Sequence, residues 1–133
     1  MKIVSHLEIK EEIIMGKVSI TINGSEVSNI FPAVTIGVSA AATGDEVIFF
    51  ILPAALPAFV KGGLEKVNEK AKNLPDLMEM IDGLKMLDAK FLICELGFDV
   101  HGLKEEDMME GCEIVGATTF VVRAGGSDLT FSF

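Results

Sequence analysis

Cys94 ends a short apolar run, at the place where a buried strand would deliver a thiol to the edge of a sheet. The run covers residues 91–94 (Phe-Leu-Ile-Cys) and stops abruptly at residues 95–97 (Glu-Leu-Gly). In open α/β sheets, ligands and reacting groups gather at the carboxyl ends of the strands. A thiol there has a position fixed by the backbone and helix N-termini nearby, which are conditions that make cysteine reactive. The sequence therefore identifies Cys94 as its candidate for thiol chemistry.

A second interpretation treats Cys94 as a small apolar side chain of the core, because free cysteine is among the most buried residue types. The neighbouring Glu95 favours this interpretation, since an adjacent carboxylate disfavours a thiolate. The amides of the turn that follows act in the opposite direction. From the residues alone, both interpretations stay open.

Three residues after the strand could support a reactive thiol. His101 follows Cys94 by seven residues and could act as its base or ion-pair partner, or only stabilise a loop. Asp99 is expected to cap a helix over residues 103–110 rather than to act as an acid. Gly97 belongs to the turn directly after the strand.

The second thiol, Cys112, falls in a predicted connection and is interpreted as incidental. A disulfide with Cys94 stays open, because the sequence does not give the separation of the two Cα atoms. The two cysteines and two histidines of the chain lack the paired spacing of a zinc site. We therefore expect neither a metal nor an organic cofactor.

The composition indicates one domain with a buried sheet. Half of the 133 residues are hydrophobic, and the formal charge is −9 without a cluster of Lys and Arg, which argues against nucleic acid as a partner. The longest apolar stretch, residues 47–60, contains two prolines and falls short of the roughly 20 residues of a membrane span. Charges at Lys2 and Glu8 come too early for a signal peptide, so we expect a cytoplasmic protein. A chain this short cannot comfortably bury so much apolar surface, which predicts a homo-oligomer.

The hydrophobic pattern predicts alternating strands and helices, and therefore an α/β fold with a mainly parallel sheet and helices on both faces. Residues 1–15 are interpreted as an N-terminal extension, and residues 16–133 as the domain. We expect strands over 17–22, 46–52, 90–94 and 128–133. We expect helices over 29–43 with Ser28 as N-cap, 59–72, 75–87, 103–110 and 116–124.

The segment 53–63 follows the predicted central strand, so it should emerge at the same edge of the sheet as Cys94. Its prolines and its paired glycines disfavour a regular helix and permit a gate over the thiol. An ordinary connection packed on the core is the alternative. The apolar side chains that would form the gate are Leu56, Phe59 and Val60.

Residues 91–124 resemble the DsrE/DsrF/DsrH-like family of small sulfur-relay proteins. The family pattern is a strand ending in Cys, a loop with Asp and Gly-Leu, a Lys/Glu-rich turn, and Glu-Ile-x-Gly-Ala before a helix. The chain departs from this pattern at Phe98 and His101, where methionines are frequent, and at residues 53–55, where an aromatic segment is usual. The matching residues are Cys94, Asp99, Gly102-Leu103-Lys104-Glu105-Glu106 and Glu113-Ile114-Val115-Gly116-Ala117.

The resemblance implies a flavodoxin-like α/β domain that assembles into trimers or larger rings. It also implies that Cys94 carries sulfane sulfur, as a persulfide or thiosulfonate, and exchanges it with a partner such as a TusA-like carrier protein. We therefore interpret the chain as a cytoplasmic sulfur carrier or sulfurtransferase. The alternative is a non-catalytic oligomeric α/β binding module with Cys94 in its core.

Overall fold

The computed structural model describes residues 16–133, so the predicted extension over residues 1–15 lies outside the described residues. Its five strands form one sheet, and every pairing between neighbours is parallel. The order across the sheet is β4-β3-β2-β1-β5. This confirms the predicted α/β class with a parallel sheet. The strands are β1 (Lys17–Ile22), β2 (Glu46–Ile51), β3 (Lys90–Cys94), β4 (Cys112–Val115) and β5 (Leu129–Ser132).

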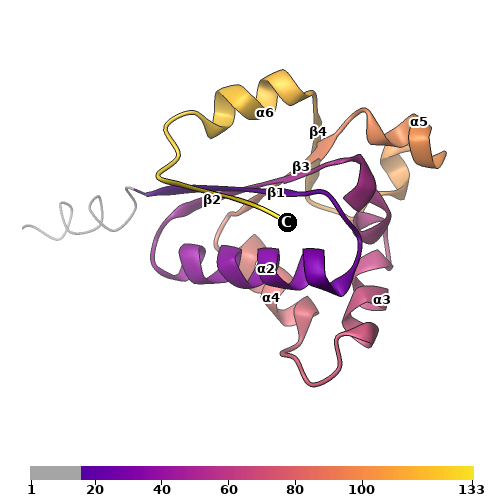
Figure 1. The fold of residues 1–133 in the computed structure, drawn as a ribbon, viewed down its shortest axis with the longest axis horizontal. Helices are drawn as coiled ribbons and strands as arrows, with labels where there is room; N and C mark the ends of the chain where they lie inside the picture. The colour runs from indigo at the N-terminus through magenta and orange to yellow at the C-terminus, as the bar shows by residue number, and fades with distance from the viewer. Residues whose placement is uncertain (1–15) are drawn as a thin grey trace, which may run out of the picture.

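This strand order explains why the two faces of the sheet are covered so unequally. From β1 to β4 each strand lies beside the one before it, always in the same direction, so right-handed crossovers place the long connecting helices on one face. That face carries α2 (Val27–Ala42), α3 (Gly63–Lys70) and α4 (Leu77–Met86). The return from β4 across the sheet to β5 runs over the other face through α6 (Ala117–Ala124) (Figure 1). The prediction of helices on both faces is therefore confirmed. Among the described residues, three helices cover one face of the sheet and one helix covers the other.

The main core lies between the sheet and the three-helix face. Alternate residues of the central strands point into it, and the rings of Phe49 and Phe91 stack there with their centroids 4.9 Å apart. The intervening residues of the same strands point to the α6 face, where Ile48 and Leu92 belong to a second, smaller cluster. Because both sets are buried, these strands are apolar throughout, as is typical of a parallel sheet covered on both sides.

Helix α2 begins two residues earlier than the sequence pattern indicates. Glu26 is its N-cap, and the Oδ1 atom of Asn29 accepts a hydrogen bond from the Glu26 backbone N–H at 3.2 Å. Ser28 lies inside the helix, so its predicted role as the cap is wrong. The reciprocal contact between Glu26 and Asn29 supplies the cap instead.

The helix predicted over residues 59–72 is shorter, because α3 begins at Gly63, and the helix predicted over residues 103–110 does not form. The connections that hold these residues pair with each other. The first connection contains η1, a 3-10 helix (Pro53–Phe59), as its prolines lead one to expect, and the second contains only the short η2 (Glu105–Asp107). The Met109 backbone N–H donates to the Phe59 carbonyl at 2.9 Å, and the Lys61 N–H donates to the Asp107 carbonyl at 2.9 Å. These bonds between connections replace bonds within a longer helix. The strand β4 that follows was not expected from the sequence.

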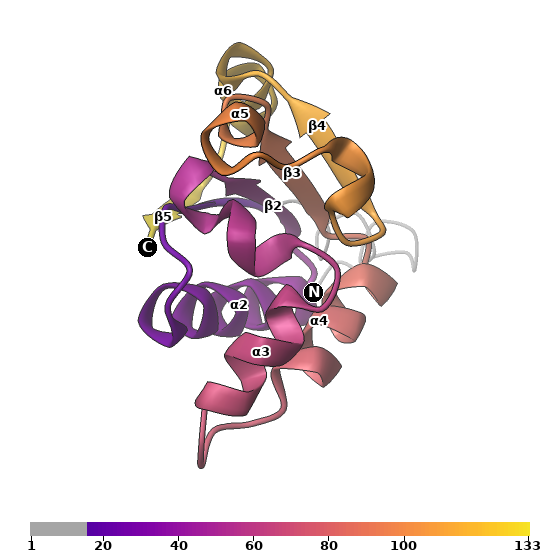
Figure 2. The same ribbon diagram turned by 90° about the vertical axis from the view of Figure 1, so that its right-hand side faces the viewer.

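At the carboxyl end of β3 the chain forms α5 (Gly97–His101), a short helix that lies beyond the strand ends in Figure 1 and faces the viewer in Figure 2. No helix in residues 16–133 has both the length and the apolar character needed to cross a membrane.

Candidate functional site

Cys94 is the last residue of β3, and its side chain points to the α6 face of the sheet. It is 2% exposed and belongs to the smaller core cluster, with Val115 directly beside it in the register of β3 and β4. The thiol is therefore held at the carboxyl edge of the sheet in an apolar compartment. The other buried members of this cluster are Ile48, Phe50 and Leu92, and Leu52 and Phe120 pack against them.

Helix α6 supplies the cover of this compartment. The ring of Phe120 stacks on that of Phe50, with centroids 4.4 Å apart and planes 12° from parallel. The helix starts after Gly116, which directly follows Val115. The Glu95 backbone N–H donates to the Val115 carbonyl at 3.0 Å, and a Cβ added to Gly116 would lie 3.1 Å from Glu95 Oε1. The thiol thus sits in the cluster beneath α6, next to the turn that begins it.

The three predicted supporting residues all lie in α5. His101 Nε2 lies 2.6 Å from the Pro53 carbonyl oxygen, so the nitrogen must carry a proton and donate it. This bond fastens α5 to η1, and a role of His101 as a base for Cys94 stays a prediction. Asp99 is exposed in the first turn of α5. Its predicted role as the cap of a helix over residues 103–110 is wrong, because that helix does not form.

Gly97 is the point of closest approach between α5 and η1. A Cβ built on it would lie 2.5 Å from Leu56 Cδ2 and 2.9 Å from Leu56 Cδ1. Leu56 is fully buried in the main core, so a shift of its side chain would disturb the packing around it. Glycine at this position lets the turn after Cys94 pack directly onto the core.

We expect Gly97→Ala to lower the free energy of unfolding by about 1–3 kcal/mol, the usual cost of overpacking. Gly83→Ala is the matched control, because Gly83 lies inside α4 and nothing approaches its added Cβ within 4 Å. The control should raise stability by about 0.5–1 kcal/mol through helix propensity. Urea unfolding measures both values, and an unchanged stability of Gly97→Ala would contradict the tight packing.

The predicted gate residues lie elsewhere in the fold. Leu56 and Phe59 belong to the main core on the three-helix face, where the Phe59 ring lies 6.5 Å from that of Phe91. Val60 is half-buried and forms an isolated bridge with Met108. The prediction that Leu56 and Phe59 cover Cys94 is therefore corrected, because they lie on the opposite face of the sheet. Sharing an edge with Cys94 did not imply sharing a face.

Cys112 is free, as is Cys94, and the two thiols lie on opposite faces of the sheet. Cys112 pairs in register with Phe91 and packs against the main core, so the disulfide that the sequence left open does not form. Burial raises the pKa of Cys112 from 9.0 to about 11, and the positive charge of Lys85 opposes this only in part. Cys112 is therefore a protonated thiol at neutral pH.

The raised pKa of Cys112 predicts a loss of stability in alkali. Its folded pKa lies above its unfolded value of 9.0, so the stability is fully present below pH 9 and is lost as the pH rises through about 11. After allowance for partial exposure, we expect a loss of about 1–2 kcal/mol. Thermal melts at pH 8 and pH 11 should show a smaller decrease for Cys112→Ala than for the wild type. An equal decrease in the two proteins would contradict the raised pKa of Cys112.

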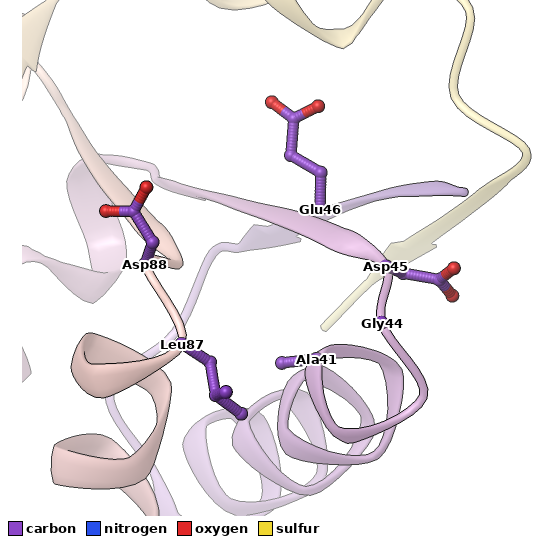
Figure 3. A pocket seen from close by; sticks show the side chains of 6 residues that line it. All are labelled: Ala41, Gly44, Asp45, Glu46, Leu87 and Asp88. Carbon is purple, nitrogen blue, oxygen red and sulfur yellow. The ribbon is translucent and has the colours of Figure 1, made fainter. Parts of the chain in front are cut away.

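A hollow of about 390 Å³ lies at the amino ends of β2 and β3, the edge opposite to Cys94. Three carboxylates surround it, from Asp45, Glu46 and Asp88, and they point away from one another (Figure 3). Asp88 pairs with Lys90 Nζ at 3.0 Å. Among residues 16–133, no group of three or more His, Cys, Asp and Glu side chains is placed to hold a metal ion.

The residue that sequence analysis missed is Phe120. The signal was present as an aromatic residue on the predicted helix 116–124, but the pattern did not show which face of the sheet that helix covers. The right-handed crossover rule, applied to the strand order, would have placed α6 over Cys94.

Comparison with known proteins agrees with this arrangement. The sequence profile of the DsrE/DsrF/DrsH-like family matches residues 52–131. The structure is similar to the crystal structure of the ychN protein from E. coli, with a TM-score of 0.71 and 17% identity over 90% of this chain and 100% of that one. It is also similar to MTH1491 of Methanobacterium thermoautotrophicum, a protein of unknown function, with a TM-score of 0.68 and 12% identity over 87% and 98% of the two chains.

A further relative is the uncharacterized protein MJ0760 of Methanocaldococcus jannaschii, which is 32% identical over 74 residues. That match covers 56% of this chain and 26% of the relative, so the chain spans about a quarter of the length of the curated protein it matches. The family match includes β3, Cys94, β4 and α6, and covers more than half of the chain. The chain belongs to the DsrE/DsrF/DrsH-like family.

Proposed function

We propose that the protein is a sulfur carrier or sulfurtransferase that holds sulfane sulfur on Cys94. The observation that carries the proposal is a free cysteine at the carboxyl end of β3, within the family match and inside a separate apolar compartment. Cys112, the other thiol, stays protonated at neutral pH and faces the main core. One thiolate is sufficient for the chemistry.

In the proposed reaction, the Cys94 thiolate attacks the outer sulfur of a donor R–S–SH. A new S–S bond forms to Cys94 as the donor S–S bond breaks, and the donor leaves as the thiolate RS⁻. The product is Cys94–S–SH, with its proton carried over on the transferred sulfur. An acceptor thiolate then repeats the same displacement and releases Cys94 as a thiolate. The two steps exchange sulfur without net oxidation, so the proposed chemistry calls for no cofactor.

The apolar compartment suits a reactive sulfur group. Burial among Phe50, Leu92 and Val115 keeps water and oxidants away from the transferred sulfur between the two steps. Following the family resemblance, we propose a small carrier protein of the TusA-like type as the exchange partner, in the cytoplasm. Assembly into a trimer or larger ring belongs to the same proposal.

The second candidate function is an oligomeric binding module in which Cys94 only packs. The 2% exposure of Cys94 favours it. Loading the protein with sulfur distinguishes the two candidate functions. After incubation with polysulfide and removal of excess reagent, a carrier should gain a mass of about 32 Da per sulfur. Cyanide should then release the sulfur as thiocyanate and restore the original mass. A binding module would show neither result.

A further inference from the structure

Cys94 is 2% exposed, so it can exchange sulfur with another protein only if a segment that covers its thiol moves away. We propose that α6 is the movable lid of this thiol and that Phe120 is the side chain that keeps it closed. The use of the lid in sulfur transfer rests on the proposed function, whereas its motion can be tested without it. The lid replaces the gate that the sequence placed in residues 53–63.

Helix α6 is weakly packed compared with the helices on the other face. It contains no buried residue, whereas α2, α3 and α4 each bury at least three. Val121 and Val122 are 66% and 73% exposed on its outer side. A helix of eight residues is also too short to be stable in water without packing. Helix α6 is therefore expected to open at a lower cost than the rest of the domain.

The contacts that hold α6 are few and unevenly distributed. Its C-terminal end is fixed by Lys17, whose Nζ donates to the carbonyls of Arg123 at 3.0 Å and Gly125 at 2.9 Å. Arg123 also pairs with Glu113 at 2.8 Å, but this pair is partly exposed and contributes little. The stack of Phe120 on Phe50 is therefore the apolar contact that keeps the helix over the Cys94 cluster.

Both ends of α6 have glycines that permit movement. Gly116 precedes the helix, and Gly125 and Gly126 follow it, with Gly126 in the left-handed region at φ +80°. Because Val115 is fixed in the sheet at one end and Lys17 holds the other, α6 cannot swing away as a rigid arm. The available motion is lifting of Phe120 from Phe50 together with melting of the helix between the glycines. This motion uncovers the Cys94 cluster and leaves the main core intact.

The test is the rate at which N-ethylmaleimide alkylates Cys94, measured by intact mass in a Cys112→Ser background. Phe120→Ala should raise this rate about ten-fold by favouring the open state. The exposed pair Thr118→Ala and Thr119→Ala should lower it several-fold, because alanine strengthens the helix without touching the compartment. The two changes act in opposite directions on one equilibrium.

Phe31→Ala is the matched control, since Phe31 is also half-buried but packs against the main core on the opposite face. It should leave the alkylation rate within about two-fold of the background protein, because it weakens a part of the domain that does not open with α6. An unchanged rate in Phe120→Ala, or an equal rise in Phe31→Ala, would overturn the lid. The second outcome would show that Cys94 reacts through global unfolding.

Polysulfide loading of the same proteins separates the lid from the proposed function. Normal loading with an alkylation rate that Phe120→Ala does not change would reject the lid and retain the sulfur carrier. Faster alkylation without any gain of sulfur would retain the lid and reject the carrier.

Discussion

Cys94→Ser is expected to abolish uptake of sulfane sulfur, whereas Cys112→Ser should load like the wild type. A serine hydroxyl is not ionised at neutral pH and cannot form a persulfide, so the loss should be complete. Cys112 should not substitute for Cys94, because its pKa of about 11 leaves it protonated and its side chain faces the main core. Incubation with polysulfide or tetrathionate followed by intact mass spectrometry measures the adduct.

The adduct on the wild type should disappear on treatment with DTT, which distinguishes a persulfide or thiosulfonate from irreversible oxidation. Thermal melts of both variants serve as the control for folding. An adduct that persists in Cys94→Ser and vanishes in Cys112→Ser would show that Cys112 carries the sulfur, and it would overturn the proposal.

We also expect the protein to form an oligomer in solution. Light scattering at micromolar concentration is expected to give a multiple of the 14.3 kDa of one chain, with three chains as the expected state. The structure leaves large apolar side chains exposed near the site, and exposed apolar side chains that gather on one surface mark sites of association. Two of them are Leu96, which precedes α5, and Val100, which lies within it.

Leu96→Lys and Val100→Lys introduce charges at α5 and should lower the measured mass if this helix lies in the interface. Met86→Lys is the control, since Met86 is also strongly exposed but lies at the end of α4, before the amino end of β3 and away from α5. A wild-type mass near that of a single chain would reject the oligomer.

Much of the fold follows from local patterns in the sequence. Residues 47–51 and 91–94 are apolar and rich in β-branched and aromatic side chains, and they lie in the strands β2 and β3 as expected. Helix α4 follows the Pro75-Asp76 start signal, with Asp76 as the N-cap that accepts from the Met78 N–H. The position of Cys94 at the end of β3 was predicted for the same reason.

The parts that were not predicted depend on contacts between distant segments. β4 has four residues, of which only Val115 is buried, so its sequence carries too little alternation to indicate a strand. The pairing of Phe59 with Met109 links residues fifty positions apart. The face of the sheet that a connection covers depends on the order of the strands, which the sequence does not show. The gate over Cys94 was therefore predicted in η1 and not in α6.

The crossing of α6 from one edge of the sheet to the other also sets an order for folding. Strands β1 to β4 and the three-helix core are made from residues 17–115, whereas β5 pairs with β1 over a separation of 111 residues. Contacts so distant in sequence form late, and a chain under synthesis folds from its N-terminus. A nascent chain therefore completes its core with Cys94 still uncovered. The thiol becomes enclosed only when residues 117–133, which form α6 and β5, have left the ribosome.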